Sequence, residues 1–137
     1  MTQLISYLTF NGNCREAMHF YQECLGGELY FQTVGEMPLS AKLPECMKAC
    51  ILHASLQKNG WVLMGTDMVG DQGLIRGNAV SILIECSSEK EMKSYYKMLV
   101  AGGQTTYPIA QTFWGAWFGG LTDKYGNHWL MNFNRNQ

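Results

Sequence analysis

The chain has 137 residues, of which 47% are hydrophobic and 15% are charged, and its formal net charge is -1. This length and composition exclude a disordered chain and predict one domain or two small fused units. The near-neutral charge argues against nucleic acid or a membrane surface as a partner, because both favour a basic face. No apolar run approaches the roughly 18 residues of a membrane span. No signal-peptide pattern is present, so we expect a cytoplasmic protein.

The sequence contains five cysteines and three histidines. An odd number of cysteines without a secretory signal predicts free thiols in a reducing compartment. No C-x-x-C pattern occurs and the histidines lack zinc-finger spacing, so a zinc site on these residues is not expected. The cysteines are interpreted as small hydrophobic residues of the core or as surface thiols.

The first half of the chain predicts a strand, a helix and three further strands. The first strand, 4–10, ends at Asn11-Gly12-Asn13, where Asn13 can cap the helix that follows. That helix ends at Gly26-Gly27. Its apolar stripe, at i, i+3, i+4, i+7 and i+8, consists of Ala17, Phe20, Tyr21, Cys24 and Leu25. The remaining strands are predicted over 28–33, 47–57 and 61–66, with a long loop over 35–45.

The same order returns in the second half, after a linker over about 68–78. A strand over 80–86 leads to the capping box Ser88–Glu91 and to a second helix, which ends at Gly102-Gly103. The apolar stripe of this helix consists of Met92, Tyr95, Tyr96, Leu99 and Val100. Three more strands are predicted over 105–109, 116–121 and 128–133. The repeat predicts two βαβββ modules, about 1–67 and 79–137, within a single domain over 1–137.

Three motifs carry a resemblance to a known family. They are N-G-N-C-R-E-A at the start of the first helix, F-Y-x-x-x-L-G-G at its end, and T-F-W-G-x-x-F-G-x-L-x-D-x-x-G-x-x-W near the C-terminus. The chain resembles the PhnB-like branch of the glyoxalase/bleomycin-resistance/extradiol-dioxygenase (vicinal oxygen chelate) superfamily. The resemblance implies an α+β fold in which two tandem βαβββ modules form a cupped, largely antiparallel sheet pair with helices on the outer face. Some members of this branch are described as demethylubiquinone methyltransferases, and the chain has no glycine-rich nucleotide loop.

Enzymes of this superfamily hold a divalent metal on the first and last strands of each module. Counting along the motifs places the four ligand positions at Ser6, Leu63, Ser81 and Leu130. Serine and leucine do not form a metal site, because divalent cations bind carboxylate and imidazole groups. The resemblance therefore predicts no bound metal and no cofactor. A displaced site near Asp67, His53, Glu85 and His128 would require a shifted register.

Each predicted helix covers one face of its sheet and leaves the other face to enclose a cleft between the modules. The residues predicted to bind a small-molecule ligand there are His53, Ser55, Glu85, Trp114 and Trp117. His53 and Ser55 alternate with apolar neighbours, Glu85 is a candidate base, and the two tryptophans can stack on a flat ligand. A structural histidine and core-filling tryptophans remain the alternatives. Tyr7, on the face opposite Ser6, is expected to pack in the core.

Two functions remain open from the sequence. The first is a binding protein that takes up a small apolar or aromatic compound in the cleft between the modules without a metal. The second is a metal-dependent lyase, isomerase or dioxygenase of the vicinal oxygen chelate type. In either case a homodimer is expected, because sheet edges with aromatic residues near their ends would otherwise be exposed.

Overall fold

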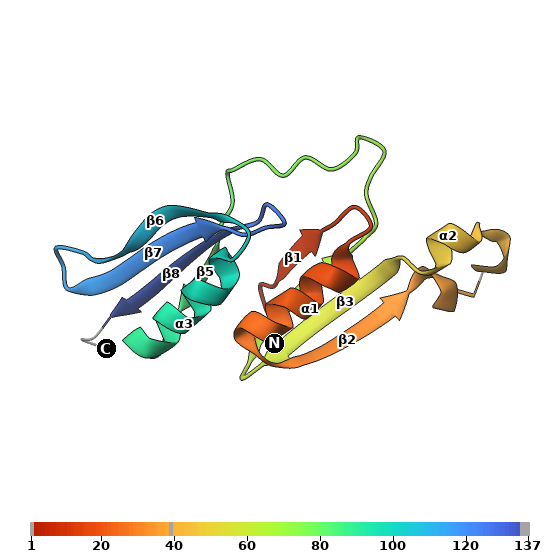
Figure 1. Ribbon diagram of the computed structural model, residues 1–137. Coiled ribbons are helices and arrows are strands. Elements are labelled where there is room, and N and C mark those ends of the chain that lie inside the picture. The colour runs from red at the N-terminus through yellow and green to blue at the C-terminus, as the bar shows by residue number, and fades with distance from the viewer. Residues whose placement is uncertain (1, 39, 135–137) are drawn as a thin grey trace. The chain divides into compact units, whose positions relative to one another are not determined.

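The computed structural model describes residues 2–38 and 40–134, and the chain forms two compact units, Met1–Ile75 (unit 1) and Arg76–Gln137 (unit 2) (Figure 1). Unit 1 contains β1 (Ser6–Thr9), α1 (Cys14–Leu25), β2 (Glu28–Thr33), η1 (Val34–Glu36), η2 (Ser40–Lys42), α2 (Glu45–Lys48), β3 (Ile51–Lys58) and β4 (Trp61–Thr66). Unit 2 contains β5 (Ile82–Glu85), α3 (Glu89–Val100), β6 (Gln104–Gln111), β7 (Ala116–Thr122) and β8 (His128–Asn134). None of the described helices is long and apolar enough to cross a membrane.

Both units have the same topology. Their strand orders are β1-β4-β3-β2 and β5-β8-β7-β6. In each sheet the first strand pairs in parallel with the last, and the other two pairs are antiparallel. This confirms the α+β fold and the tandem βαβββ repeat.

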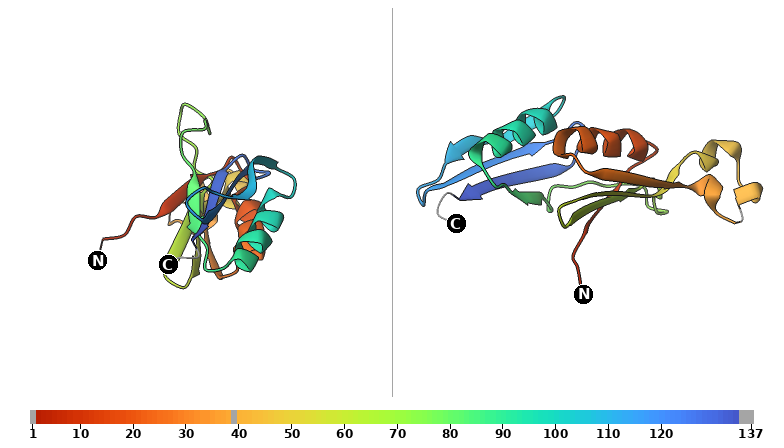
Figure 2. Two further views of the ribbon diagram at one scale, coloured as in Figure 1. Left: turned by 90° about the vertical axis from the view of Figure 1, so that its left-hand side faces the viewer. Right: turned by 90° about the horizontal axis from the view of Figure 1, so that it is seen from below.

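Each long helix lies along one face of the sheet of its own unit (Figure 2). In unit 1 the covered face is identified by Gly65 of β4, because a Cβ atom there would lie 3.2 Å from the sulfur atoms of Cys14 and Met18. Side chains alternate along a strand, so neighbouring residues point to the opposite face. Each unit therefore has a helix-covered face and a helix-free face.

The segment between β2 and β3 differs from the prediction. Residues 47–50 were expected to begin a strand, but α2 takes up Met47 and Lys48, and β3 begins at Ile51. Pro44 stands immediately before this helical turn, whose Glu45 and Lys48 side chains form an ion pair at 2.9 Å. The long loop expected over 35–45 also contains short helical turns. Proline before the first helical residue and the i,i+3 ion pair favour helix here over strand.

The two long helices begin in different ways. Ser88 caps α3 as predicted, because its hydroxyl accepts a hydrogen bond from the Glu91 N–H at 3.0 Å. The predicted cap of α1 is wrong, since the Asn13 side chain makes no capping hydrogen bond. The carboxylate of Asp67 accepts from the Cys14 N–H at 2.9 Å instead. A residue 53 positions away in the sequence therefore caps α1.

The buried stripe of α1 is rotated slightly from the prediction. Its buried residues are Cys14, Ala17, Met18, Tyr21, Cys24 and Leu25. Phe20 is half-buried at the edge of this stripe, with its ring centroid 5.8 Å from that of Tyr21. In α3 only Met92 and Leu99 are buried, and the other predicted members of the stripe are half-buried. The prediction of fully buried sites at Phe20 and Tyr95 is therefore wrong.

Truncating Phe20 to alanine is expected to lower the free energy of unfolding by about 1–2 kcal/mol, because only part of the ring leaves contact with the core. The same truncation at the fully buried Tyr21 is the matched comparison, with an expected loss of about 3–5 kcal/mol. Equilibrium urea unfolding measures both values. Equal losses at the two positions would contradict the placement of Phe20 at the edge of the stripe.

Candidate functional site

A row of four side chains crosses the helix-free face of unit 1. The strand register aligns Tyr7 of β1 with Met64 of β4, Met64 with Ser55 of β3, and Ser55 with Tyr30 of β2. The two tyrosines at the ends of the row are 53% and 56% exposed. His53 lies on the same face, and its ring stacks on the Tyr7 ring with centroids 6.0 Å apart. The face therefore presents aromatic rings together with an imidazole.

Hydrogen bonds connect the polar groups of this row to neighbouring strand residues. The Tyr30 hydroxyl donates to Glu28 at 2.7 Å, and this bond together with the negative charge of Glu28 raises the pKa of Tyr30. The Ser55 hydroxyl is buried and accepts from the Gln57 amide at 3.1 Å. Within the described residues, no hydrogen bond to the His53 ring is formed, and its contact there is the Tyr7 ring.

The structure corrects the predicted face of β1. Ser6 pairs with Leu63, which is buried on the same face of β4 as Gly65, so Ser6 belongs to the helix-covered face. Tyr7 was expected in the core and instead lies on the helix-free face. A shift of one residue in a strand exchanges its two faces. The positions of unit 1 that face away from the helix are therefore Tyr7 and Met64, not Ser6 and Leu63.

Unit 2 has the corresponding row on its helix-free face. It consists of Leu83 of β5, Leu130 of β8, Gly120 of β7 and Tyr107 of β6. The next row contains Glu85, Asn132 and Phe118. The Asn132 amide donates to both carboxylate oxygens of Glu85, at 3.1 and 3.3 Å. Predicted candidate Glu85 is therefore exposed on this face, beside apolar side chains.

The two candidate tryptophans lie away from this row. Trp117 is on the helix-covered face, where the Lys93 amine lies 5.3 Å from the centre of its ring. Its indole N–H is buried and has no hydrogen-bond partner within the described residues. Trp114 is in the turn between β6 and β7, exposed, with its ring edge-on to that of Phe113. The aromatic ring that β7 places on the helix-free face is Phe118.

The residues at the superfamily's metal positions do not fit a divalent cation. In unit 1 the pair that faces away from the helix is Tyr7 with Met64, and in unit 2 Leu130 pairs with Leu83, because the predicted position Ser81 lies just before β5. None of these side chains is a carboxylate or an imidazole. Residues 2–38 and 40–134 contain no group of three or more His, Cys, Asp or Glu residues that could hold a metal ion.

Three of the four groups considered for a displaced metal site, Asp67, Glu85 and His128, have hydrogen-bond partners. Asp67 accepts from the backbone N–H groups of Gly12, Cys14 and Ile51, and His128 contacts Thr122 and the Gly77 carbonyl. Thiolate ligands are also disfavoured. Burial, followed by the charge of a nearby carboxylate, raises the pKa of Cys14 and of Cys86 to about 12.

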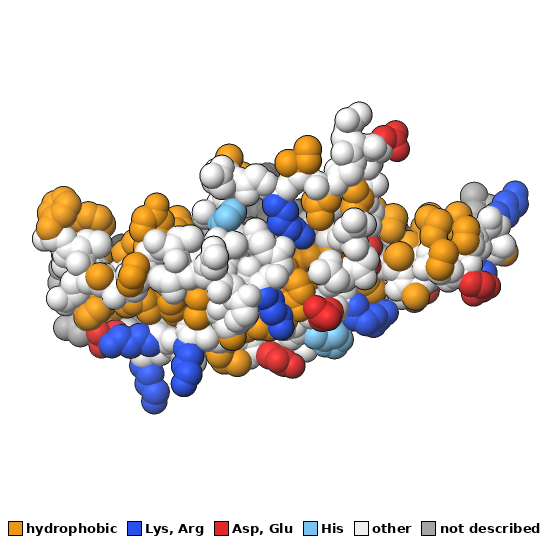
Figure 3. All heavy atoms as spheres, turned by 45° about the horizontal axis from the view of Figure 1, so that its top comes forward, with side chains coloured by type: hydrophobic (Ala, Val, Ile, Leu, Met, Phe, Trp, Pro, Cys, Tyr) orange, Lys and Arg blue, Asp and Glu red, His pale blue; other side chains and the backbone are white. Residues whose placement is uncertain are grey.

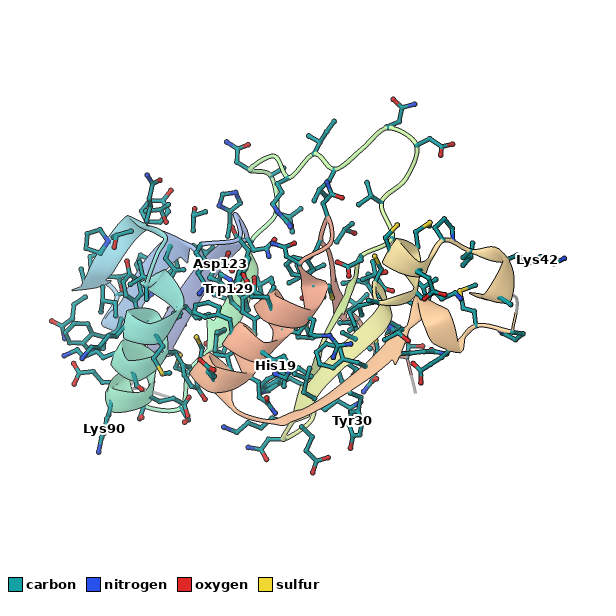
Figure 4. All side chains as sticks on the ribbon, turned by 45° about the vertical axis from the view of Figure 1, so that its right-hand side comes forward. His19, Tyr30, Lys42, Lys90, Asp123 and Trp129 are labelled. Carbon is teal, nitrogen blue, oxygen red and sulfur yellow. The ribbon has the colours of Figure 1, made fainter. Side chains whose placement is uncertain are left out.

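Two aspartates organise the local structure, and the sequence indicated their role poorly. Asp67 was named above only as a residue near a possible displaced metal site, yet its carboxylate connects the start of α1 with the start of β3. Asp123 accepts from the Trp129 indole at 2.8 Å and from two backbone N–H groups of the turn between β7 and β8. Figure 4 labels Asp123 and Trp129, which lie next to each other in unit 2. The D-x-x-G-x-x-W motif is thus a structural turn.

Comparison with known proteins places this chain in a family. Residues 2–131 match the family described as 3-demethylubiquinone-9 3-methyltransferase. Protein YjdN of Escherichia coli (strain K12) is 32% identical over 143 residues, which cover 98% of this chain and 97% of YjdN.

Solved structures show the same relationship. Protein PA1353 from Pseudomonas aeruginosa has a TM-score of 0.86 at 34% identity, with 98% of each chain covered. A PhnB protein from Bacillus cereus, described with the same methyltransferase name, has a TM-score of 0.74 at 23% identity, covering 96% of this chain and 99% of its own. More distant structures with TM-scores of 0.57–0.63 are described as glyoxalase/bleomycin resistance proteins or dioxygenases. The chain therefore belongs to the family described as 3-demethylubiquinone-9 3-methyltransferase, and it shares its fold with the PhnB protein and with the glyoxalase/bleomycin resistance/dioxygenase proteins.

Proposed function

We propose that this protein binds a small apolar or aromatic compound on the helix-free faces of its sheets, without the divalent metal used by enzymes of the superfamily. The observation that carries the proposal is the row of Tyr7, Met64, Ser55 and Tyr30, whose two aromatic ends, on the edge strands β1 and β2, are more than half exposed. Exposed aromatic and thioether groups on a regular surface are typical of a binding site.

The chemistry of these faces suits a flat ligand. A planar ring that stacks on Tyr7 or on Phe118 buries apolar area on both partners, and aromatic pairs add about 0.5–1.5 kcal/mol beyond that burial. Hydrophobic side chains also reach the surface at many places in both units (Figure 3). The polar groups beside the rings, His53 in unit 1 and Glu85 in unit 2, can orient a ligand that carries hydrogen-bonding groups.

A thermal-shift screen tests the proposal. Planar aromatic compounds are expected to raise the melting temperature, because a ligand stabilises the folded state by RT ln(1 + [L]/Kd). Ni²⁺, Zn²⁺ and Mn²⁺ are expected to raise it little. The screen is repeated on His53→Ala and Glu85→Ala, with His19→Ala as the control, since His19 is exposed on α1 and packs against Phe31. A large metal shift that disappears in His53→Ala or Glu85→Ala would contradict the proposal and favour a metal-dependent lyase, isomerase or dioxygenase.

We also propose that the protein is a homodimer. The turn between β6 and β7 presents Phe113, which is 97% exposed, and Trp114 beside it. The turn is held by hydrogen bonds between Thr112 and Ala116, so the two rings are presented at little cost in conformational entropy. Sedimentation equilibrium is expected to show a dimer for the wild type and a weaker dimer for Trp114→Ala. A monomer at high micromolar concentration would contradict this.

A further inference from the structure

The strands of unit 2 carry very few charged side chains. Neither lysine nor arginine occurs in the described strands β5, β6, β7 and β8, and their one carboxylate belongs to Glu85 at the end of β5. The lysines of this unit lie on α3, where Figure 4 labels Lys90, and in the turn between β7 and β8. The described strands of unit 2 thus present a single carboxylate and no lysine or arginine on their helix-free face.

The Glu85 carboxylate can accept a second partner. The Asn132 amide donates to both of its oxygens, at 3.1 and 3.3 Å, and no ion pair to Glu85 is formed among the residues that the structure describes. The two oxygens of a carboxylate offer about four acceptor sites. The Arg76 guanidinium donates to Asn127 just before β8, which is roughly 16 Å from Asn132 along the strand. An exposed carboxylate with remaining acceptor capacity is complementary to a cation.

An aromatic surface lies beside this carboxylate on the same face. Asn132 pairs with Phe118 of β7, and the Phe118 ring centroid is 6.1 Å from that of Tyr107, which is more than half exposed. The Tyr107 ring covers Gly120, since a Cβ atom there would lie 2.8 Å from it. The strands of Glu85 and Phe118 are separated by two strand spacings, roughly 10 Å. A bicyclic ring with a short arm can therefore lie on Phe118 and extend across Asn132 to Glu85.

We propose that the helix-free face of unit 2 binds a planar aromatic cation, whose ring stacks on Phe118 and whose ammonium group donates hydrogen bonds to the Glu85 carboxylate. This inference rests on the proposed function, because it specifies the charge of the ligand on one of the same faces. A hydrogen bond between two charged groups is roughly twice as strong as a neutral one. The bound ring also keeps water from one side of the carboxylate, so the attraction exceeds that of an ion pair with both partners in water.

Isothermal titration calorimetry with three compounds that share one ring system tests the proposal. At about pH 7, 2-naphthylmethylamine is a cation, 2-naphthalenemethanol is neutral and 2-naphthoate is an anion. The amine is expected to bind about fivefold more tightly than the alcohol, and the naphthoate more weakly than the alcohol. Binding of the naphthoate as tightly as the amine, or more tightly, would overturn the proposal.

Substitutions assign the preference to one residue. Glu85→Gln keeps the shape and one acceptor but removes the charge, so the amine and the alcohol are expected to bind equally, the alcohol as tightly as before. Glu28→Gln is the matched control, because this exposed carboxylate lies on the helix-free face of unit 1, where it accepts from the Tyr30 hydroxyl. It removes the same charge and is expected to leave the preference for the amine unchanged. Phe118→Leu is expected to weaken the amine and the alcohol by the same factor, since both stack on that ring.

The outcomes separate this inference from the function on which it rests. If the alcohol binds as tightly as the amine to the wild type, the proposal of a cation is wrong and the aromatic-binding function stands. If none of the three compounds binds, the proposed function itself is wrong. A preference for the amine that persists in Glu85→Gln, or that disappears in Glu28→Gln, would overturn the assignment to the unit 2 face.

Discussion

Replacing Asp67 with alanine is expected to lower the free energy of unfolding by about 3–5 kcal/mol. The carboxylate accepts three backbone hydrogen bonds, from Gly12 at 3.0 Å, Cys14 at 2.9 Å and Ile51 at 2.8 Å. Alanine leaves these N–H groups without their acceptor, and each unsatisfied buried donor costs about 1–3 kcal/mol. Equilibrium urea denaturation measures the loss.

Three further variants test the cause of this effect. Asp67→Asn is expected to lower the free energy of unfolding by about 1–3 kcal/mol, less than Asp67→Ala, because one amide oxygen remains as an acceptor. Asn13→Ala and Asp71→Ala are controls with expected changes within about 0.5 kcal/mol, since the Asn13 side chain does not cap α1 and Asp71 is exposed. A loss below about 1 kcal/mol for Asp67→Ala would show that this carboxylate does not hold α1 and β3 together.

Replacing Gly103 with alanine is expected to lower the free energy of unfolding by about 3 kcal/mol or more. A Cβ atom at this position would overlap the Thr122 carbonyl oxygen and would lie 2.8 Å from the Asp123 carbonyl carbon. Both atoms belong to the backbone, so no side-chain rotation can relieve the contact. The end of β7 would have to move away from the turn that leads from α3 into β6.

Gly70→Ala is the matched control for this prediction. No atom lies within 4 Å of a Cβ built at Gly70, and its φ is outside the left-handed region. Gly70→Ala is expected to leave the melting temperature unchanged or to raise it slightly, because alanine lowers the conformational entropy of the unfolded chain. Thermal unfolding of both variants by circular dichroism measures the difference. Equal melting temperatures for Gly103→Ala and Gly70→Ala would contradict the close approach of the turn between α3 and β6 to the end of β7.

The order of elements could be predicted because local patterns encode it. Periodicity 2 identified the strands, the i, i+3, i+4 stripes identified both long helices, and Gly26-Gly27 and Gly102-Gly103 marked their ends. The two similar stripes also revealed the repeat, which the identical strand orders confirm. The prediction failed for 47–50, where Pro44 and an ion pair on one turn outweighed the β-propensity of the residues that follow.

The face of each side chain was harder to predict than its element. The ligand position on β1 was found by counting back from Phe20, and this count crosses the turn at 11–13. An error of one residue in that turn assigned Ser6 to the helix-free face, where the structure has Tyr7. In β7, the alternation was correct, but the sequence does not state which of its two faces α3 covers, so Trp117 was preferred over Phe118. The role of Asp67 depends on contacts with residues far away in the sequence, which no local pattern contains.

Methyl NMR of the methionines tests the central claim most directly. Met64 lies on the helix-free face of unit 1, whereas Met18, Met92 and Met131 are fully buried. Titration with 2-naphthol, a planar and uncharged compound, is expected to shift the Met64 methyl resonance through the ring current and to leave the three buried methyl resonances in place. Shifts at the buried methionines with no change at Met64, or no shift at any methionine, would contradict binding on the helix-free face.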